Sequence, residues 1–165
     1  MPRGVTRTIL SRTEEMHRLL LSEGCVAVEK ARRALGVSRM QARYVLSRLH
    51  AEGRAVPVAV GRATLWCRDG EAAALILGEL ADEARRLLCG LRFTTPSRLL
   101  KLISRDEKAN RTFSKYIPLS PKAAAAVSFL NAILQLILGQ PAMHRGATPV
   151  YLVPPCRGVK FKSWR

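Results

Sequence analysis

The sequence contains few acidic residues for its number of basic ones. Its 28 lysines and arginines outnumber the 12 aspartates and glutamates and give a formal net charge of +16. A small anionic substrate does not explain such an excess, whereas a polyanionic partner does. The chain is nevertheless 48% hydrophobic, which excludes disorder throughout its length. We therefore expect a folded, basic protein that binds nucleic acid.

Closely spaced metal ligands are also absent. The cysteines, at positions 25, 67, 89 and 156, form no CxxC pair, and the three histidines are equally scattered. Zinc sites usually bring two ligands together on one turn, so we expect no metal and no cofactor. Because the chain is neither short nor rich in cysteine, we expect reduced thiols and a cytoplasmic location, with disulfides as the open alternative.

Long apolar runs and catalytic motifs are missing as well. The longest apolar stretch, residues 123–138, is 16 residues long and is interrupted by Ser128, Asn131 and Gln135. A bilayer span needs about 20 mostly apolar residues, so this stretch predicts a buried helix and we expect no membrane association. The first residues contain no run typical of a signal peptide. No phosphate loop, GxSxG or HExxH motif occurs, and we expect no enzymatic activity.

The first part of the chain predicts three helices. Hydrophobic periodicity places them at about 12–23, 27–35 and 39–52. Ser11 and Glu14 fit a capping box at the start of the first helix. Ser38 is a natural N-cap for the third helix.

Two β-rich runs follow the third helix. They surround a turn at Gly61-Arg62 and predict a hairpin over residues 55–67. Pro57 indicates that its strand is an edge strand, because proline cannot donate to a central ladder. The stretch RRALGVSRMQARYVLSRLHAEGR, residues 32–54, followed by this hairpin, resembles the winged helix-turn-helix superfamily. The resemblance covers residues 10–68.

The third helix is the main candidate for a binding surface. Its apolar residues recur at helical spacing and face inward. In winged-helix proteins that bind DNA, the opposite face enters the major groove, where arginine and glutamine read base edges. The resemblance therefore implies that this face and the turn of the hairpin bind nucleic acid. The candidate residues are Arg39, Gln41, Arg43, Tyr44 and Arg48 of the helix and Arg62 of the turn. Met40 and Tyr44 make this face somewhat apolar, which leaves RNA or protein open as the partner.

The second part of the chain predicts four further helices. They are expected at about 71–90, 97–105, 106–117 and 122–138. Thr95 with Pro96 and, later, Asp106 supply start signals for the second and third of them. Basic residues three or four positions apart predict a phosphate-binding stripe made of Arg98, Lys101, Arg105, Lys108, Arg111 and Lys115.

The C-terminal segment has a distinctive composition. Residues 142–165 contain three prolines, two glycines, five basic residues and no acid, and no periodic pattern defines an element. Its last residues interleave cations with aromatic rings, which is typical of an arm that neutralises phosphates and stacks on bases. The candidate residues are Arg157, Lys160, Phe161, Lys162, Trp164 and Arg165.

Together these patterns predict a mainly α fold with a small β-hairpin wing. The expected segments are a basic N-terminal segment (1–10), a winged helix-turn-helix (11–69), a helical region (70–141) and an extended basic tail (142–165). The favoured function is a non-catalytic RNA-binding ribosomal protein, or another component of a ribonucleoprotein beside neighbouring proteins, because the chain resembles the general style of archaeal ribosomal proteins. The alternative is a double-stranded DNA-binding transcription regulator, possible as a homodimer with recognition helices about 34 Å apart.

Overall fold

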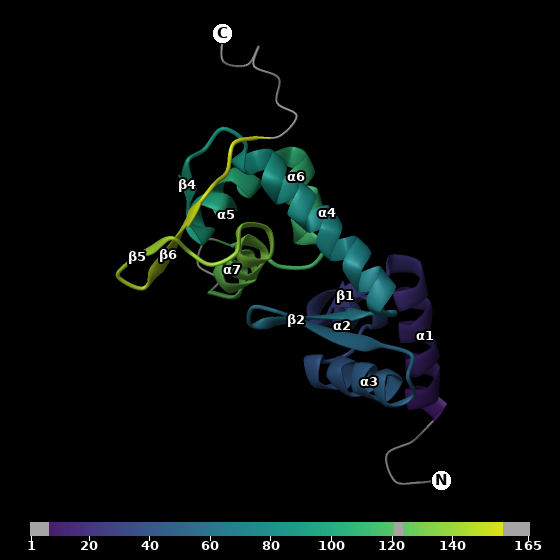
Figure 1. The fold of residues 1–165 in the computed structure, drawn as a ribbon. Coiled ribbons are helices and arrows are strands. Elements are labelled where there is room, and N and C mark those ends of the chain that lie inside the picture. The colour runs from purple at the N-terminus through teal and green to yellow at the C-terminus, as the bar shows by residue number, and fades with distance from the viewer. Residues whose placement is uncertain (1–6, 121–123, 157–165) are drawn as a thin grey trace.

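The N-terminal part of the chain folds as the sequence predicts, with one added strand. The computed structural model describes residues 7–120 and 124–156 (Figure 1). The elements of this part are α1 (Arg7–Glu23), β1 (Cys25–Ala27), α2 (Val28–Leu35), α3 (Arg39–Ala51), β2 (Val56–Val60) and β3 (Ala63–Cys67). We call the β2–β3 hairpin the wing. Three helices followed by a hairpin confirm the expected winged-helix order.

The first helix starts earlier than its sequence signals suggest. Because α1 begins at Arg7, Ser11 and Glu14 lie inside it, and the predicted capping box at its start is wrong. The Thr13 hydroxyl donates to the backbone carbonyl of Ile9, 2.7 Å away, as a residue within a helix can. The Glu14 carboxylate instead accepts hydrogen bonds from Arg54 at 3.0 Å, which tie α1 to the loop after α3.

The N-terminal sheet is covered on both faces. Its antiparallel strands lie in the order β1-β3-β2, which confirms that Pro57 sits in an edge strand. Val26 and Trp66 face a core shared with α1, α2 and α3. Side chains on the opposite face, Leu65 and Val60 among them, join the core of the C-terminal half. The sheet therefore belongs to both halves of the molecule.

The C-terminal half contains the four expected helices. They are α4 (Gly70–Leu88), α5 (Pro96–Arg105), α6 (Glu107–Ser114) and α7 (Ala124–Leu138). The Thr95 hydroxyl accepts a hydrogen bond from the Arg98 backbone N–H, so this N-cap is confirmed. The Asp106 side chain makes no cap hydrogen bond and binds Arg86 instead. We call this half, described from residue 70 to 156, the C-terminal body.

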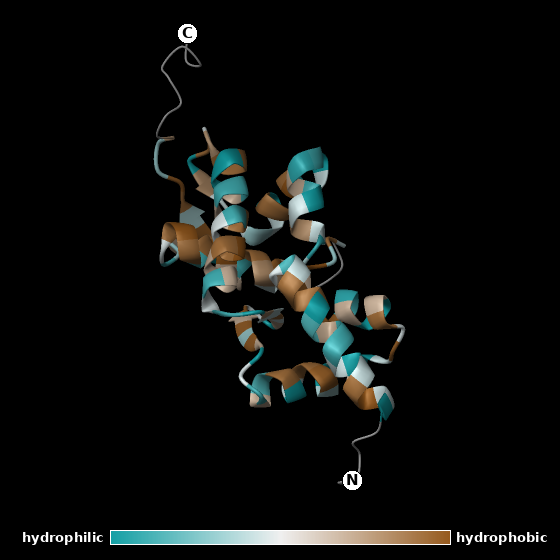
Figure 2. Cartoon of the chain, turned by 90° about the vertical axis from the view of Figure 1, so that its right-hand side faces the viewer, coloured by the Kyte–Doolittle hydropathy of each residue, from teal (hydrophilic) through white to brown (hydrophobic). Residues whose placement is uncertain are grey.

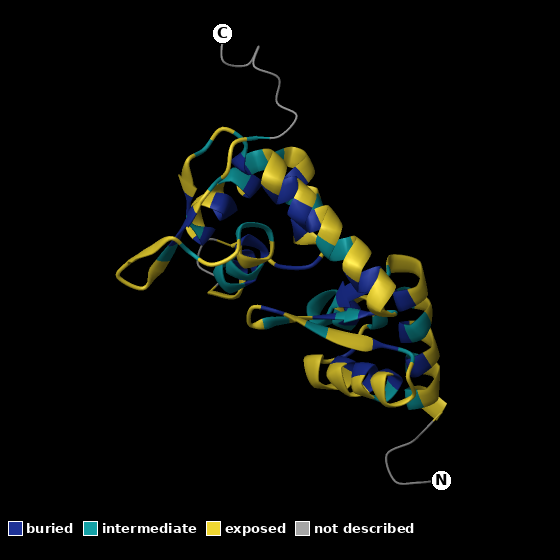
Figure 3. Cartoon of the chain, in the orientation of Figure 1, coloured by how far each residue is buried: buried dark blue, intermediate teal, exposed yellow. Residues whose placement is uncertain are grey.

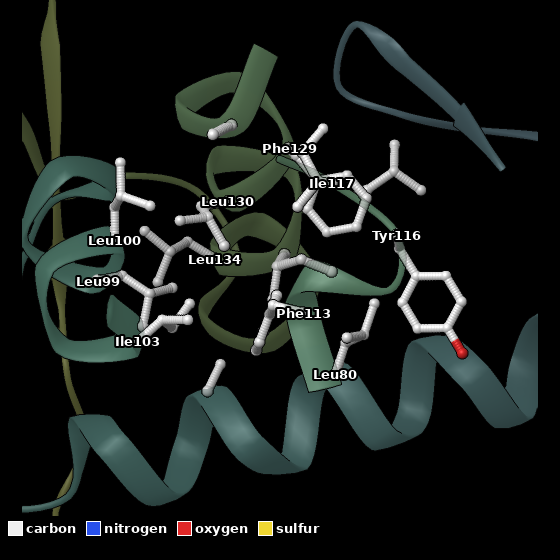
Figure 4. Close-up of a cluster of buried hydrophobic side chains, with 14 of the residues drawn as sticks. Leu80, Leu99, Leu100, Ile103, Phe113, Tyr116, Ile117, Phe129, Leu130 and Leu134 are labelled. Carbon is white, nitrogen blue, oxygen red and sulfur yellow. The ribbon is translucent and has the colours of Figure 1, made fainter. Parts of the chain in front are cut away.

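The helices of the C-terminal body pack around one apolar core. Leu80 of α4, Leu99 of α5, Phe113 of α6 and Leu130 of α7 point toward one another in Figure 4, and all four are fully buried. Hydrophobic residues alternate with hydrophilic ones along most helices, which gives each an apolar face for packing (Figure 2). None of the helices in the described part of the chain is long and apolar enough to cross a membrane.

A second small sheet replaces part of the predicted tail. Strands β4 (Phe93–Thr94), β5 (Met143–Arg145) and β6 (Thr148–Leu152) lie in the order β4-β6-β5. The prediction of an extended tail from residue 142 is therefore wrong as far as residue 152. Tyr151 holds β6 in place, since its ring is fully buried and its hydroxyl donates to the Asn131 side chain at 2.5 Å.

The cysteines are paired, which corrects the expectation of reduced thiols. One disulfide joins Cys25 to Cys67 and the other joins Cys89 to Cys156. Cys25 and Cys67 lie directly opposite each other on β1 and β3. Their sequence separation of 42 residues gives no hint of this, because β1 was not predicted.

Candidate nucleic-acid interface

The third helix is built as a rigid and well-capped element. The Ser38 hydroxyl accepts from the Gln41 backbone N–H at 3.1 Å, and the Gln41 side chain accepts from the Ser38 backbone N–H at 3.0 Å. This reciprocal capping box satisfies two backbone donors at the helix start. Its inner face is buried in the N-terminal core and comprises Ala42, Val45, Leu46 and Leu49. The helix therefore presents its other face in a fixed orientation.

The outward face of α3 has an apolar centre and charged flanks. Met40 is 81% exposed and Tyr44 is 47% exposed, and Ser47 one turn further on is also exposed. Arg39 and Arg43 are exposed on one flank. On the other flank Arg48 is half-buried and its Nε atom lies 3.7 Å from the Glu52 carboxylate. The predicted residues of α3 therefore lie on its outward face, but they do not form a uniformly basic surface.

A groove separates α3 and its neighbours from the C-terminal body. Its larger part, of about 560 Å³, lies between the winged helix and the segment around Tyr116. An adjoining part of about 380 Å³ shares several lining residues and continues past Lys115. The basic residues lining the two parts are Lys30, Arg33, Arg39, Arg43, Arg62 and Lys115. We call this feature the basic groove.

Most of the charge in the basic groove is unneutralised. Glu29 is the acidic residue that lines it, and its carboxylate binds Arg32 and lies 3.5 Å from Arg33. The hydrogen bond from Arg32, reinforced by neighbouring positive charges, lowers the pKa of Glu29. Lys30 is paired with Glu23 at 3.2 Å. Within the described residues, no ion pair reaches the remaining cations, Arg39, Arg43, Arg62 and Lys115.

The wing is docked against α7 rather than extended into solvent. The Arg62 backbone N–H donates to the Ser128 hydroxyl at 3.0 Å. The close approach requires glycine at position 61, because a Cβ there would clash with the carbonyl oxygen of Ser128. In Figure 1 the wing tip lies beside α7. The exposed side chain of Arg62 is therefore carried by a fixed turn at the edge of the basic groove.

The six residues of the predicted basic stripe on the C-terminal helices lie in different environments. Lys108 pairs with Glu83 of α4 at 3.1 Å. Burial favours the neutral form of Glu83, yet hydrogen bonds from Arg86 and Lys108 hold its pKa below the ordinary value. Lys115 lies at the basic groove, and Arg98 lines a separate hollow beside β5 and β6. Lys101, Arg105 and Arg111 are exposed. The helix that carries the first three residues of the predicted stripe ends at Arg105, Asp106 has an extended backbone, and α6 begins at Glu107, so the six residues lie on two separate helices and the residue that follows them.

The remaining predicted residues lie outside the described part of the chain. These are Arg157, Lys160, Phe161, Lys162, Trp164 and Arg165. Sequence reasoning also missed two basic residues of the groove, Lys30 and Arg33, and the available signal was the group of basic residues in the short helix α2. Among the described residues, no group of three or more histidines, cysteines, aspartates and glutamates is placed to hold a metal ion.

Comparisons with known proteins agree with this architecture. A family described as "PSV, transcriptional regulator domain" matches residues 75–152, and one described as "FaeA-like protein" matches residues 9–69. The crystal structure of a hypothetical protein from Pyrobaculum spherical virus superposes with a TM-score of 0.82 at 32% identity, and the match covers 90% of this chain and 97% of that chain. The chain belongs to the family of this viral protein. A comparison with curated proteins gives no significant match.

The match to the viral protein supports the fold described above over most of the chain. The winged-helix-type fold predicted for residues 10–68 is confirmed, and the family likeness extends through the C-terminal body. Neither the family descriptions nor the structural relative points to a ribosomal protein. The resemblance to archaeal ribosomal proteins therefore has no support.

Proposed function

We propose that this chain is a non-catalytic transcription regulator that binds double-stranded DNA, with α3 as its recognition helix. The observation that carries the proposal is the outward face of α3, where Met40, Tyr44 and Ser47 are exposed beside Arg39 and Arg43, two arginines that form no ion pair with another described residue. The description of the matching family as a transcriptional regulator domain supports the same function. This was the alternative at the sequence level, and it now takes precedence over RNA binding.

The chemistry of α3 suits contact with base edges in a major groove. Arginine can donate two hydrogen bonds to guanine, and apolar side chains contact the methyl group of thymine. Met40 and Tyr44 supply the apolar contact at the centre of the face, and Arg39 and Arg43 lie where they can bind bases or phosphates beside it. A mixed face of this kind favours a site that contains both thymine and guanine.

A selection experiment tests this proposal directly. The full chain is used to select binders from a random duplex library, and its affinity is then measured by fluorescence anisotropy for the selected duplex, a scrambled duplex and an RNA of the same sequence. We expect the selected duplex to bind most tightly. Failure to enrich any duplex, or tighter binding to the RNA, would overturn the proposal.

Substitutions in α3 test its role as the recognition helix. Combining Met40→Ala with Tyr44→Ala should remove most of the preference for the selected duplex, because a lost base contact costs about 1–3 kcal/mol of discrimination. Arg18→Ala, at an exposed position of α1, is the control and should leave the preference intact. Unchanged preference in the α3 double variant would show that another element reads the bases.

A further inference from the structure

We propose that the basic groove holds the sugar-phosphate backbone of the same duplex, so that the C-terminal body is part of the DNA-binding surface. This inference rests on the proposed function, because α3 positions the duplex. It adds a binding site formed by both halves of the chain, in which Arg62 and Lys115 face the phosphates from the wing and from the end of α6.

The first argument is the distribution of charge around the groove. Its cations come from α2, α3, the wing turn and the residue after α6, at positions that range from Lys30 to Lys115. Folding brings like charges together at a cost, and an anionic ligand offsets that cost. The one lining acid, Glu29, is already bonded to Arg32. The surplus therefore remains available to a ligand.

The second argument is the shape of the site. The groove has two adjoining parts, of about 560 Å³ and about 380 Å³, and cations line both of them. A single small anion would occupy only one end. A chain of phosphates places a charge at each repeat, and therefore matches cations distributed along a groove.

The third argument is continuity with α3. Arg39, Arg43 and Ser47 lie on α3 and also line the groove, so a duplex seated on the outward face of this helix has a backbone next to the groove. The Thr64 side chain of β3 adds a hydroxyl group to the same lining. Hydroxyl and guanidinium groups are the side chains that most often contact phosphate oxygens.

The fourth argument is the fixed position of the wing. Since Gly61 packs on Ser128 and the Arg62 backbone is hydrogen-bonded there, the wing cannot swing away as an independent arm without breaking these contacts. The groove is thus preformed, and little ordering is required when the backbone enters it. The wing acts as one wall of a phosphate site and Lys115 contributes from the other wall.

The test measures how binding depends on salt. Affinities of the full chain for the selected and scrambled duplexes are measured over a range of KCl concentrations, for wild type, Arg62→Ala, Lys115→Ala and the double variant. Each lost phosphate contact should reduce the slope of log K against log[salt] by about 0.9. The slope for the double variant should therefore be smaller by about 1.8, and its affinities for the two duplexes should fall by the same factor. Lys115→Arg should retain the wild-type slope.

Controls separate this inference from the function on which it rests. Arg18→Ala removes an exposed charge on α1 and should change the slope by less than the groove variants do. Both groove positions are exposed, so the thermal midpoint should stay near that of wild type. If wild type binds duplex DNA but the groove variants keep its slope, the groove inference is wrong and the proposed function stands. If wild type prefers RNA over every duplex, the proposed function fails and the groove inference fails with it.

Discussion

Two hairpins of the described chain have the same turn but different surroundings. The wing turns at Gly61-Arg62 and the β5–β6 hairpin turns at Gly146-Ala147, each as a two-residue loop. The first loop residue is glycine with φ of +63° in one and +59° in the other, as a type II′ turn requires. Side chains of β3 enter both cores, Leu65 that of the C-terminal body and Trp66 that of the N-terminal half, and the wing tip is docked on α7. All three residues of β5, in contrast, are exposed (Figure 3).

The comparison shows that the two hairpins share a turn conformation, while contacts with the rest of the chain hold only the wing tip in place. A Cβ added at Gly146 would have no other atom within 4 Å, whereas a Cβ added at Gly61 would clash with Ser128. The wing is therefore a wall of the basic groove, and the tip of the β5–β6 hairpin projects into solvent. Both hairpins are nevertheless anchored at their C-terminal side, by Cys67 in one and by Cys156 in the other.

Removing these anchors should give the largest effects on stability. Replacing both cysteines of either disulfide by alanine should lower the free energy of unfolding by about 4 kcal/mol, with about 0.4 kcal/mol more for the Cys89–Cys156 pair. The longer loop, 67 residues against 42, accounts for the difference. Urea unfolding measures both values. Thiol titration of the denatured wild type should find no free thiol among the four cysteines, and detecting free thiols would contradict the pairing.

Truncating one leucine in each hairpin tests the difference in packing. Leu65 of the wing is 1% exposed and Leu152 of β6 is 57% exposed. Leu65→Ala should cost about 2–5 kcal/mol because it leaves a cavity between the sheet and the C-terminal body. Leu152→Ala should stay within about 0.5 kcal/mol of wild type. Equal losses in thermal unfolding would mean that the wing is not packed as described.

The same contrast explains how far the fold could be predicted from the sequence. The wing was predictable because its strands are five residues long, with three valines in β2 and Thr64 and Trp66 in β3, and because a glycine turn lies between them. The β5 strand is the three residues Met-His-Arg, which have no β-branched member, and the following strand contains a proline, Pro149, which disfavours a strand prediction. Their pairing depends on Tyr151 entering the core, a tertiary contact that no local pattern reveals.

The candidate site shows the same division between local and tertiary information. The inner and outer faces of α3 follow from helical periodicity, and the cap at Ser38 follows from the preference for serine at the N-cap position. The basic groove cannot be predicted in this way, because Arg62 and Lys115 come to line its two adjoining parts only in the folded chain. Likewise, the pairing of Lys108 with Glu83 depends on how α6 packs on α4, which the spacing of the basic residues could not show.

Adding a methyl group at each turn glycine separates turn strain from docking. Gly146→Ala should cost about 1–3 kcal/mol, because alanine is strained at positive φ. Gly61→Ala carries the same strain and also a clash with Ser128, and should cost about 1–3 kcal/mol more. The difference between the urea unfolding midpoints of the two variants measures the contribution of the contact between the wing tip and α7. A difference near zero would mean that the wing tip yields freely, and that the wall of the basic groove is not fixed.

The smallest effect should come from the single hydrogen bond at the wing tip. Ser128→Ala removes the hydroxyl that accepts from the Arg62 N–H at 3.0 Å, and should cost about 0.5–1.5 kcal/mol. Because the turn is exposed, water can replace the lost acceptor, which places the expected value at the low end of that range. Amide hydrogen exchange is the sharper measurement, since the Arg62 amide should exchange faster while the Ala147 amide in the free hairpin keeps its rate. Ser22→Ala, at an exposed position of α1, should change neither rate. Equal acceleration of both hairpins would show that the substitution loosens the whole body, and would remove the distinction between a docked and a free hairpin.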